Sequence, residues 1–289
     1  MHTHFPTLLL REWMQHKRGW LIAALAPPLL FLAMLPFGQV NGLPTENAEL
    51  ISLAIVMVST WVVYAICMLV ALVQLPGLAR RDTQDRSIEF WLSLPGRPSE
   101  SVMATVVAHA WLAPLGGALI GAVLGVPIAL GVFASKTDMG SVLAVNWAEV
   151  MTAAAPLLAR GLVGTVPLML WMAPVIFTFM AASAWLKRLG VPVVLVGTGV
   201  TTAVLDKVYG ITAPAQALHG LVNQIGHTLI NNAATLEAAL RSDHVSLFSW
   251  AMTDLGQTLA ELASLQFLGW MAVAAAGFAL VVLKRAGGG

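Results

Sequence analysis

Charged side chains are scarce in this sequence, and this scarcity limits the class of protein. Only 10% of the 289 residues are Asp, Glu, Lys or Arg, against about 25% in an ordinary soluble domain. Apolar residues make up 58%, and the mean hydropathy is +0.81. A chain of 30.6 kDa has room for about six membrane spans of about 20 residues each, but not for a catalytic domain as well. We therefore exclude a water-soluble enzyme and predict an all-α polytopic membrane protein.

Cysteine and nucleotide-binding motifs are also rare or missing. The single cysteine, Cys67, lies in an apolar run, so an intrachain disulfide and a cysteine metal cluster are excluded. No G-x-x-x-x-G-K-[ST] phosphate loop occurs, so we expect no ATP-binding site, no enzymatic activity and no cofactor in this chain. The formal net charge of +1 gives no general attraction for nucleic acid, and we expect none as a partner.

Six apolar segments are long enough to cross, or nearly cross, the hydrocarbon of a membrane. They are residues 19–37, 50–75, 102–133, 161–185, 189–205 and 265–283. The third exceeds what a core of about 30 Å requires, so it must tilt, break near Pro114 or project into the cytosol. Two other segments, 134–160 and 206–264, are too long for turns and carry apolar stripes at helical spacing. We predict helical extracytoplasmic segments there, within a single transmembrane domain that covers 1–289.

Lysine and arginine are unevenly shared between the connections. With a cytoplasmic N-terminus, eleven lie inside and four outside, and the positive-inside rule then predicts both termini in the cytoplasm. The inside residues are Arg11, Lys17, Arg18, Arg80, Arg81, Arg86, Arg97, Lys187, Arg188, Lys284 and Arg285, and the outside ones are Lys136, Arg160, Lys207 and Arg241.

The residues before the first span suggest an amphipathic helix over 5–18. Pro6 can open it, one face is apolar and the rest is polar and basic, so it would lie along the cytoplasmic leaflet. The apolar face holds Leu9, Leu10, Trp13 and Met14, and the basic residues are Arg11, Lys17 and Arg18. A basic flank that only fixes the topology is the alternative, and the two interpretations are compatible.

The loop 79–100 after the second span holds the densest cluster of charge in the chain. Read as a helix, it has an apolar edge at Ile88, Trp91 and Leu92, opposite a polar face of both signs. Positive charge alone would suffice for a topogenic loop. Acidic residues and a tryptophan therefore favour a docking surface for another protein, with a solvated loop as the alternative.

The same loop carries a resemblance to a known family. The run 85–95, D-R-S-I-E-F-W-L-S-L-P, resembles the D-R-x-x-x-F-W-x-S-L-P pattern that precedes the third of six spans in bacterial export permeases of the type-2 ATP-binding-cassette (ABC) class. The N-terminal helix, the six-span layout and the short C-terminus are also similar. The sequence departs from many relatives after Pro95, where Gly96-Arg97-Pro98 replaces Val-Ser-Asp.

The resemblance implies a function and a set of partners. The chain would be a permease of the bacterial inner membrane that pairs with itself or a similar permease, while two ATP-binding subunits hold ATP and Mg²⁺. Their contact would be a coupling surface formed by Asp82, Asp85, Arg86, Glu89, Phe90 and Trp91. The cargo would be amphipathic, lipid-like, peptide or drug-like, since the pathway lacks charge. The alternative is a membrane scaffold that transmits the work of an ATPase to the cell envelope without transport.

Histidines offer the remaining candidates for chemistry. The cores of the predicted spans contain no Asp, Glu, Lys or Arg, so a self-sufficient proton-coupled carrier is not expected. His109 is either a pore or proton site, or a residue near the cytoplasmic end that bonds to water or backbone, and we favour the second. His219, His227 and His244 lie in the outer segment. The first two are about 80° apart on a helix, so we predict no metal site.

Overall fold

The protein is helical throughout the part that the computed structural model describes, which is residues 5–38, 47–80, 97–135, 145–242 and 246–286. The α-helices are α1 (Phe5–Met34), α2 (Ala48–Leu78), α5 (Pro98–Val106), α6 (Ala113–Ala134), α8 (Trp147–Leu186), α9 (Gly190–Tyr209), α10 (Ala213–His227), α11 (Ala233–Arg241), α12 (Leu247–Ala260) and α13 (Leu265–Ala286). Short 3₁₀ turns, η1 (Leu35–Phe37), η4 (Lys187–Leu189) and η5 (Glu261–Ala263), follow α1, α8 and α12, and a π-helical turn, η3 (Val107–Leu112), links α5 to α6.

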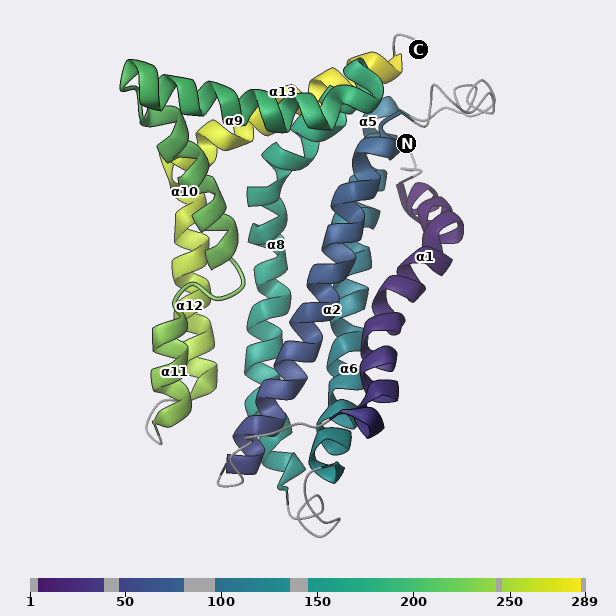
Figure 1. Ribbon diagram of the computed structural model, residues 1–289, viewed down its shortest axis with the longest axis vertical. Coiled ribbons are helices and arrows are strands. Elements are labelled where there is room, and N and C mark those ends of the chain that lie inside the picture. Colours follow the sequence, from purple (N-terminus) through teal and green to yellow (C-terminus); the bar gives the residue numbers. More distant parts are fainter. Residues whose placement is uncertain (1–4, 39–46, 81–96, 136–144, 243–245, 287–289) are drawn as a thin grey trace.

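The long helices run side by side as a bundle, and both chain ends lie toward the same end of it (Figure 1). Five helical stretches within the described ranges are long and apolar enough to cross a membrane. They are Phe5–Phe37, Ala48–Leu78, Pro98–Ala134, Trp147–Tyr209 and Leu265–Ala286. The prediction of an all-α polytopic membrane protein is confirmed. The fourth and fifth predicted spans fall within one of these stretches.

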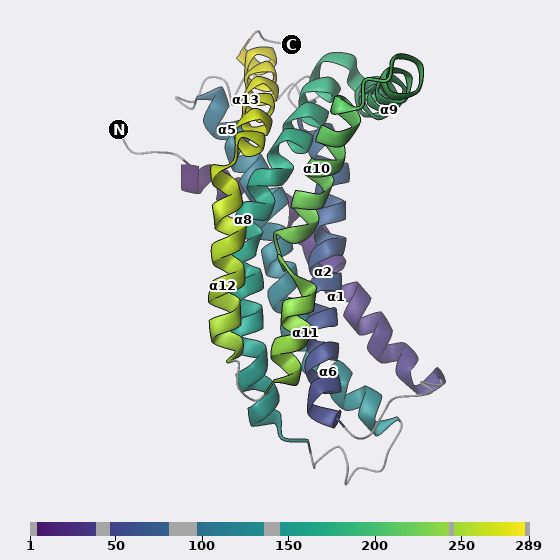
Figure 2. The same cartoon turned by 90° about the vertical axis from the view of Figure 1, so that its left-hand side faces the viewer.

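The predicted interfacial helix 5–18 and the first span 19–37 form one continuous helix, α1. No helix-breaking residue separates the two segments, and Pro27 and Pro28 lie further along, inside the helix. α1 crosses the bundle obliquely (Figure 2) and packs on α2, α5 and α6. Its first half therefore contacts the protein, as well as presenting an apolar face outward.

The third predicted span is interrupted at η3, directly before Pro114. A proline lacks an amide hydrogen and clashes with the carbonyl four residues earlier, so the ordinary α-helical bond to Ala110 cannot form. The amide of Ala113 instead donates to the carbonyl of Ala108, five residues earlier, which makes the turn wider than an α-helical one. The helix continues through this turn, so Pro98–Ala134 is one stretch of 37 residues with a widened turn directly before Pro114. Tilt of the stretch and its projection into the cytosol stay predictions.

Glycines bring α2 and α6 into close contact. A Cβ atom on Gly121 would lie 2.7 Å from the carbonyl oxygen of Ser59 and 2.9 Å from Cα of Thr60. One turn away on either side, Gly117 and Gly125 meet α2 with equally little space. The hydroxyl of Ser59 also donates to the carbonyl of Gly121 at 2.9 Å. Small residues at four-residue spacing are a common way for membrane helices to approach each other.

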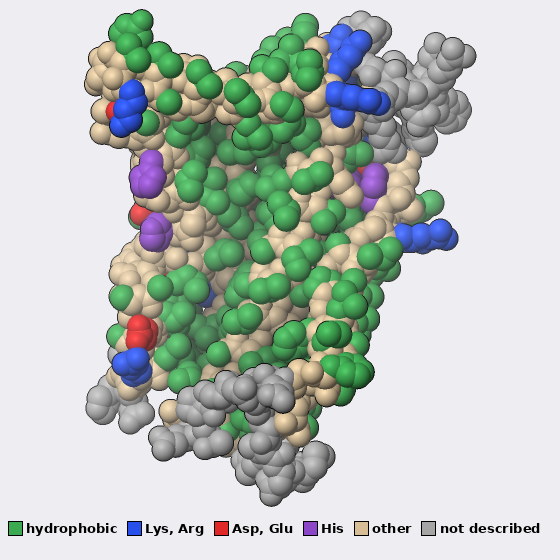
Figure 3. Space-filling view, viewed as in Figure 1, with side chains coloured by type: hydrophobic (Ala, Val, Ile, Leu, Met, Phe, Trp, Pro, Cys, Tyr) green, Lys and Arg blue, Asp and Glu red, His purple; other side chains and the backbone are tan. Residues whose placement is uncertain are grey.

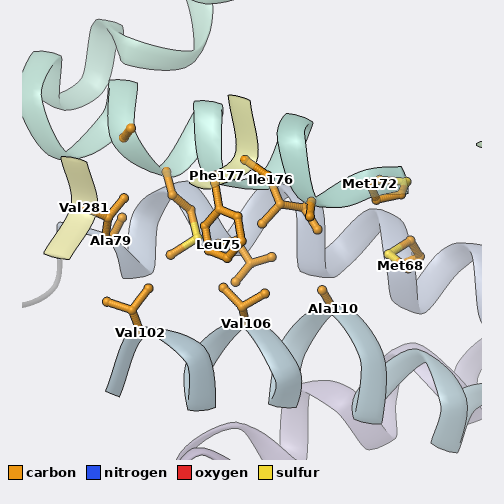
Figure 4. Packing of buried hydrophobic residues seen from close by; sticks show 14 of the residues in the cluster. Met68, Leu75, Ala79, Val102, Val106, Ala110, Met172, Ile176, Phe177 and Val281 are labelled. Atoms are coloured by element: carbon orange, nitrogen blue, oxygen red, sulfur yellow. The ribbon is translucent and has the colours of Figure 1, made fainter. Parts of the chain in front are cut away.

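The main core joins α2, α5, α8 and α13. Figure 4 shows Leu75, Val106 and Ile176 pointing toward one another from three of these helices, and all three are buried. Phe177 of α8 stacks edge to face on Phe278 of α13, with ring centroids 5.3 Å apart. The core therefore lies toward the end of the bundle where α5 begins and α13 ends.

The segment predicted as the fifth span, 189–205, does not run back along α8. It lies within α9, which crosses the end of the bundle roughly perpendicular to the other helices in both views (Figures 1 and 2). Two residues make this corner possible. Lys187 has a positive φ of 57°, and Gly190 lies against the backbone of Ala182, where a side chain would clash. The return along the bundle is made by α10 and α11 instead (Figure 1).

The two predicted outer segments are also part of the bundle. Residues 147–160 form the first turns of α8, and their apolar side chains pack with Leu53 of α2 and Trp250 of α12. Residues 206–264 include α10, α11 and α12. Helices α12 and α13 follow one another and run alongside α8 in the same direction. Asp254 contacts Arg160, and Phe267 contacts Trp171 further along. The apolar stripes of both segments therefore pack within the bundle.

We predict that Gly121→Ala destabilises the protein by about 1–3 kcal/mol, because its methyl group meets α2 backbone that cannot move aside. Thermal unfolding in detergent measures the effect. Gly116→Ala is the matched control on the same helix, since a Cβ there meets nothing within 4 Å. Equal unfolding temperatures for the two variants would show that the close contact of α2 and α6 is not tight.

Candidate functional site: the basic end of the bundle

Basic side chains gather at one end of the bundle, where both chain ends also lie (Figures 1 and 3). The middle of the face in Figure 3 is mostly hydrophobic, and most of its charged groups lie toward the two ends. Helix termini and turns at this end carry Arg80, Arg97, Lys187, Arg188, Lys207, Lys284 and Arg285. Lys207 joins them because α9 lies here, whereas the sequence placed it on the other side.

The predicted coupling surface is the connection between α2 and α5 at this end. Asp82, Asp85, Arg86, Glu89, Phe90 and Trp91 lie outside the described residues. The described flanks are Ala79 and Arg80, which follow α2, and Arg97, which precedes α5. The ends of the two helices that this loop connects are therefore defined.

The predicted interfacial residues lie on the first half of α1. Leu10, Trp13, Met14, Lys17 and Arg18 are exposed, and Leu9 and Arg11 are half-buried. The exposed apolar side chains suit contact with lipid, as the amphipathic pattern predicts. The most buried side chain of this half, Glu12, was not singled out by the sequence.

Ser101, in the first turn of α5, joins three helices. Its hydroxyl accepts a hydrogen bond from Nη1 of Arg285 at 3.2 Å and one from Nη2 of Arg11 at 3.5 Å. Arg285 ends α13 and Arg11 belongs to α1. The residue that follows the loop by one helical turn is thus held from both sides.

Thr105 and His109 continue the same face of the helix toward the membrane interior. Thr105 donates to Oε1 of Glu12 at 3.2 Å, and Nε2 of His109 lies 3.4 Å from Oε2 of the same carboxylate. Glu12 and His109 are fully buried. His109 lies in η3, two turns beyond Ser101 along the helix that begins at the basic end. Neither ring nitrogen of His109 has a hydrogen-bond partner among the described residues, and the predicted bond to water stays a prediction.

A second buried charge cluster connects α8 to α12. Nε and Nη2 of Arg160 lie 2.9 and 2.7 Å from Oδ2 of Asp254, and Nη2 also donates to Thr258 at 2.7 Å. The carboxylate accepts two further bonds from the amides of Asn231 and Asn232, each at 3.1 Å. Both charged side chains are almost fully buried. The sequence placed them in separate outer segments and gave no signal of their pairing.

A groove of about 610 Å³ lies in the corner between α8, α9, α10 and α13. Its walls combine aliphatic side chains with several threonine hydroxyls and one tryptophan. The lining includes Thr178, Val193, Gly197, Thr198, Thr201, Thr202, Leu218 and Trp270. Such walls suit a molecule with a large apolar part and a few hydrogen-bonding groups.

Comparison with known proteins does not assign the chain to a family. No protein family model matches the chain, and neither a curated protein nor a solved structure matches it. The fold and the site define the class of all-α multi-pass membrane protein, with a basic end at which a charged loop joins two long helices.

We predict that Arg160→Met or Asp254→Asn alone destabilises the protein by about 3 kcal/mol or more, because each leaves a buried partner without its counterpart. The double variant should recover part of the loss. Chemical or thermal unfolding in detergent measures both. Arg241→Ala is the control, since its pair with Glu237 is largely exposed and should contribute little. A double variant that loses as much unfolding free energy as the two single variants together would contradict direct pairing of Arg160 with Asp254.

Proposed function

We propose that this chain is the membrane-spanning subunit of an ATP-driven exporter of the bacterial cytoplasmic membrane. Two such chains, or one with a similar permease, form the pathway, and separate subunits bind and hydrolyse ATP with Mg²⁺. Both termini face the cytoplasm. The observation that carries the proposal is the D-R-S-I-E-F-W-L-S-L-P run at 85–95, in the connection between α2 and α5.

The position of this connection supports its role as a docking surface. Its flanks, Arg80 and Arg97, lie at the end of the bundle that carries most of the described basic side chains. Basic residues favour the cytoplasmic side of a membrane, which is where a nucleotide-binding partner has access to ATP. A loop with charges of both signs and two aromatic residues suits a protein partner.

The packing of α5 supports transmission of movement from the loop into the membrane. Ser101 is tied to α1 through Arg11 and to α13 through Arg285. A partner that displaces the loop by closing around ATP would therefore act on a helix that contacts both α1 and α13. Packed helices of this kind shift as bodies between discrete arrangements, which is how ligand binding at one end alters access at the other.

The groove beside α9 supports an amphipathic cargo. Its aliphatic walls and threonine hydroxyls offer burial of an apolar body together with a few hydrogen bonds. Within the described ranges its lining includes no charged side chain. A lipid-like, peptide or drug-like molecule fits this chemistry better than an inorganic ion.

We predict that Arg86→Glu reduces copurification of the ATP-binding subunit at least tenfold in mild detergent, because charge reversal in a docking surface commonly costs several kcal/mol. Membrane insertion should be unaffected. Arg188→Glu is the matched control, an exposed charge reversal at the same end of the bundle and outside the pattern. Unchanged copurification of the Arg86 variant would leave the loop with a topogenic role only.

We predict that Gly197→Trp lowers cargo-stimulated ATP hydrolysis several-fold in vesicles, because the indole fills the groove. Gly199→Trp is the control. Both glycines have open space at their Cβ positions, but only Gly197 lines the groove. Equal activity of the two variants would exclude the groove as a cargo site. Robust hydrolysis without movement of any cargo into vesicles would instead favour the non-transporting scaffold.

A further inference from the structure

Three side chains that can bind metal meet between α1 and the π-helical turn η3. Each of Glu12, His16 and His109 offers one ligand atom, and these atoms all lie within 4.8 Å of one another. Oε2 of Glu12 lies 3.4 Å from Nε2 of His109 and 3.6 Å from Nδ1 of His16. No other group of three such side chains occurs in the described ranges.

The local backbone explains why these side chains converge. Glu12 and His16 are four residues apart in α1, so they project from the same face of the helix. His109 lies in η3, the turn that Pro114 widens. Wide turns of this kind inside α-helices are rare, cost stability and are frequent at functional sites.

The carboxylate of Glu12 is oriented by its own contacts. Nη2 of Arg11 lies 2.8 Å from Oε1, and Thr105 donates to the same oxygen at 3.2 Å. These bonds turn Oε2 toward the two imidazole rings. A carboxylate held through one oxygen while the other faces histidines is a typical outer-shell arrangement of a metal ligand.

His109 is the strongest indication that a ligand belongs here. It is fully buried, and neither ring nitrogen has a hydrogen-bond partner in the described part of the chain. Burial of a polar group without a hydrogen-bond partner destabilises the folded state. A cation bound to one of these nitrogens and to Glu12 would remove this cost.

The spacing of the ligand atoms suits coordination. Two ligands bound at about 2.1 Å with a tetrahedral angle between them lie about 3.4 Å apart. Oε2 of Glu12 and Nε2 of His109 are 3.4 Å apart, which matches this value. When Nδ1 of His16 carries its proton it can donate to the carbonyl of Glu12, 3.1 Å away, which leaves Nε2 with the lone pair for a metal.

We propose that Glu12, His16 and His109 form a binding site for a divalent transition-metal ion of the zinc type. Two imidazoles and one carboxylate are the ligand set that such ions prefer, and three protein ligands leave a fourth position open. Trp20 packs edge-on against His109, with ring centroids 4.9 Å apart, and shields the site on one side. His16, with 22% of its side chain exposed, provides the route of entry.

The bound ion would join α1 to the helix that follows the charged loop. Ser101, Thr105 and His109 share one face of that helix, and all three lie against Arg11 or Glu12 of α1. The ion would therefore fix the position of α1 relative to α5 and η3. The proposed metal site requires only these contacts and is independent of the proposed transport function.

The test is metal binding by the full chain, purified in detergent with a histidine-free tag and stripped with a chelator. His2 and His4 lie outside the described residues and can bind metal themselves, so every variant carries His2→Gln and His4→Gln. We expect one equivalent of Zn²⁺ by elemental analysis, a micromolar or tighter dissociation constant by calorimetry, and a visible absorption band with Co²⁺ typical of a tetrahedral site.

His109→Gln and His16→Gln should each weaken binding at least tenfold and abolish the Co²⁺ band. His16 is partly exposed, so its variant keeps the test valid even if the His109 variant folds poorly. His219→Gln on α10 is the matched control and should bind as the parent does. Less than a tenth of an equivalent in the parent, or unchanged affinity in both ligand variants, would overturn the proposal and leave the cluster as a polar contact.

Discussion

The close contact of α2 and α6 is the constraint on which the rest of the bundle depends. Lipid is as apolar as a leucine side chain, so membrane helices gain little from hydrophobic burial against one another and associate through close packing instead. Gly121 lets the backbone of α6 approach Ser59 and Thr60 of α2. This contact fixes α6, and through the turn before Pro114 it also fixes the direction of α5. The glycines of α6 therefore set its position against α2, and α5 at the basic end continues from α6 through η3.

Two buried charge clusters in this fold differ in how completely they are satisfied. The carboxylate of Asp254 accepts bonds from the side chain of Arg160 and from two backbone amides, so the pair is saturated and its role is structural. The cluster around Glu12 is arranged differently, because His109 contributes ring nitrogens that have no hydrogen-bond partner in the described ranges. Burial of polar groups is tolerated when every group is paired. His109, incompletely paired on a widened helical turn, is the observation on which the proposed metal site rests.

The sequence predicted the fold class well but the tertiary arrangement only in part. Hydropathy and the effect of a proline both depend on residues close in the chain, so the apolar helices and a local irregularity near Pro114 could be predicted. The direction of α9 depends on the backbone of Lys187 and on space at Gly190, which hydropathy does not register. The pairing of Arg160 with Asp254 joins residues 94 positions apart. The four-residue spacing of Glu12 and His16 was visible in the sequence, but their contact with His109 was not.

The contact face between α1 and the helix after the charged loop links the two proposals physically. Ser101, Thr105 and His109 are spaced by four residues, so they form one stripe despite the change from α to π geometry. The outer end of the stripe bonds to Arg11, and its inner end lies against Glu12. If a partner displaced the loop as proposed, the movement would reach Ser101 first, where the bonds are long and part-buried, and the buried cluster last. The outer contacts would then yield while the inner ones hold, with the Glu12–His109 contact as the pivot for movement of α5 against α1.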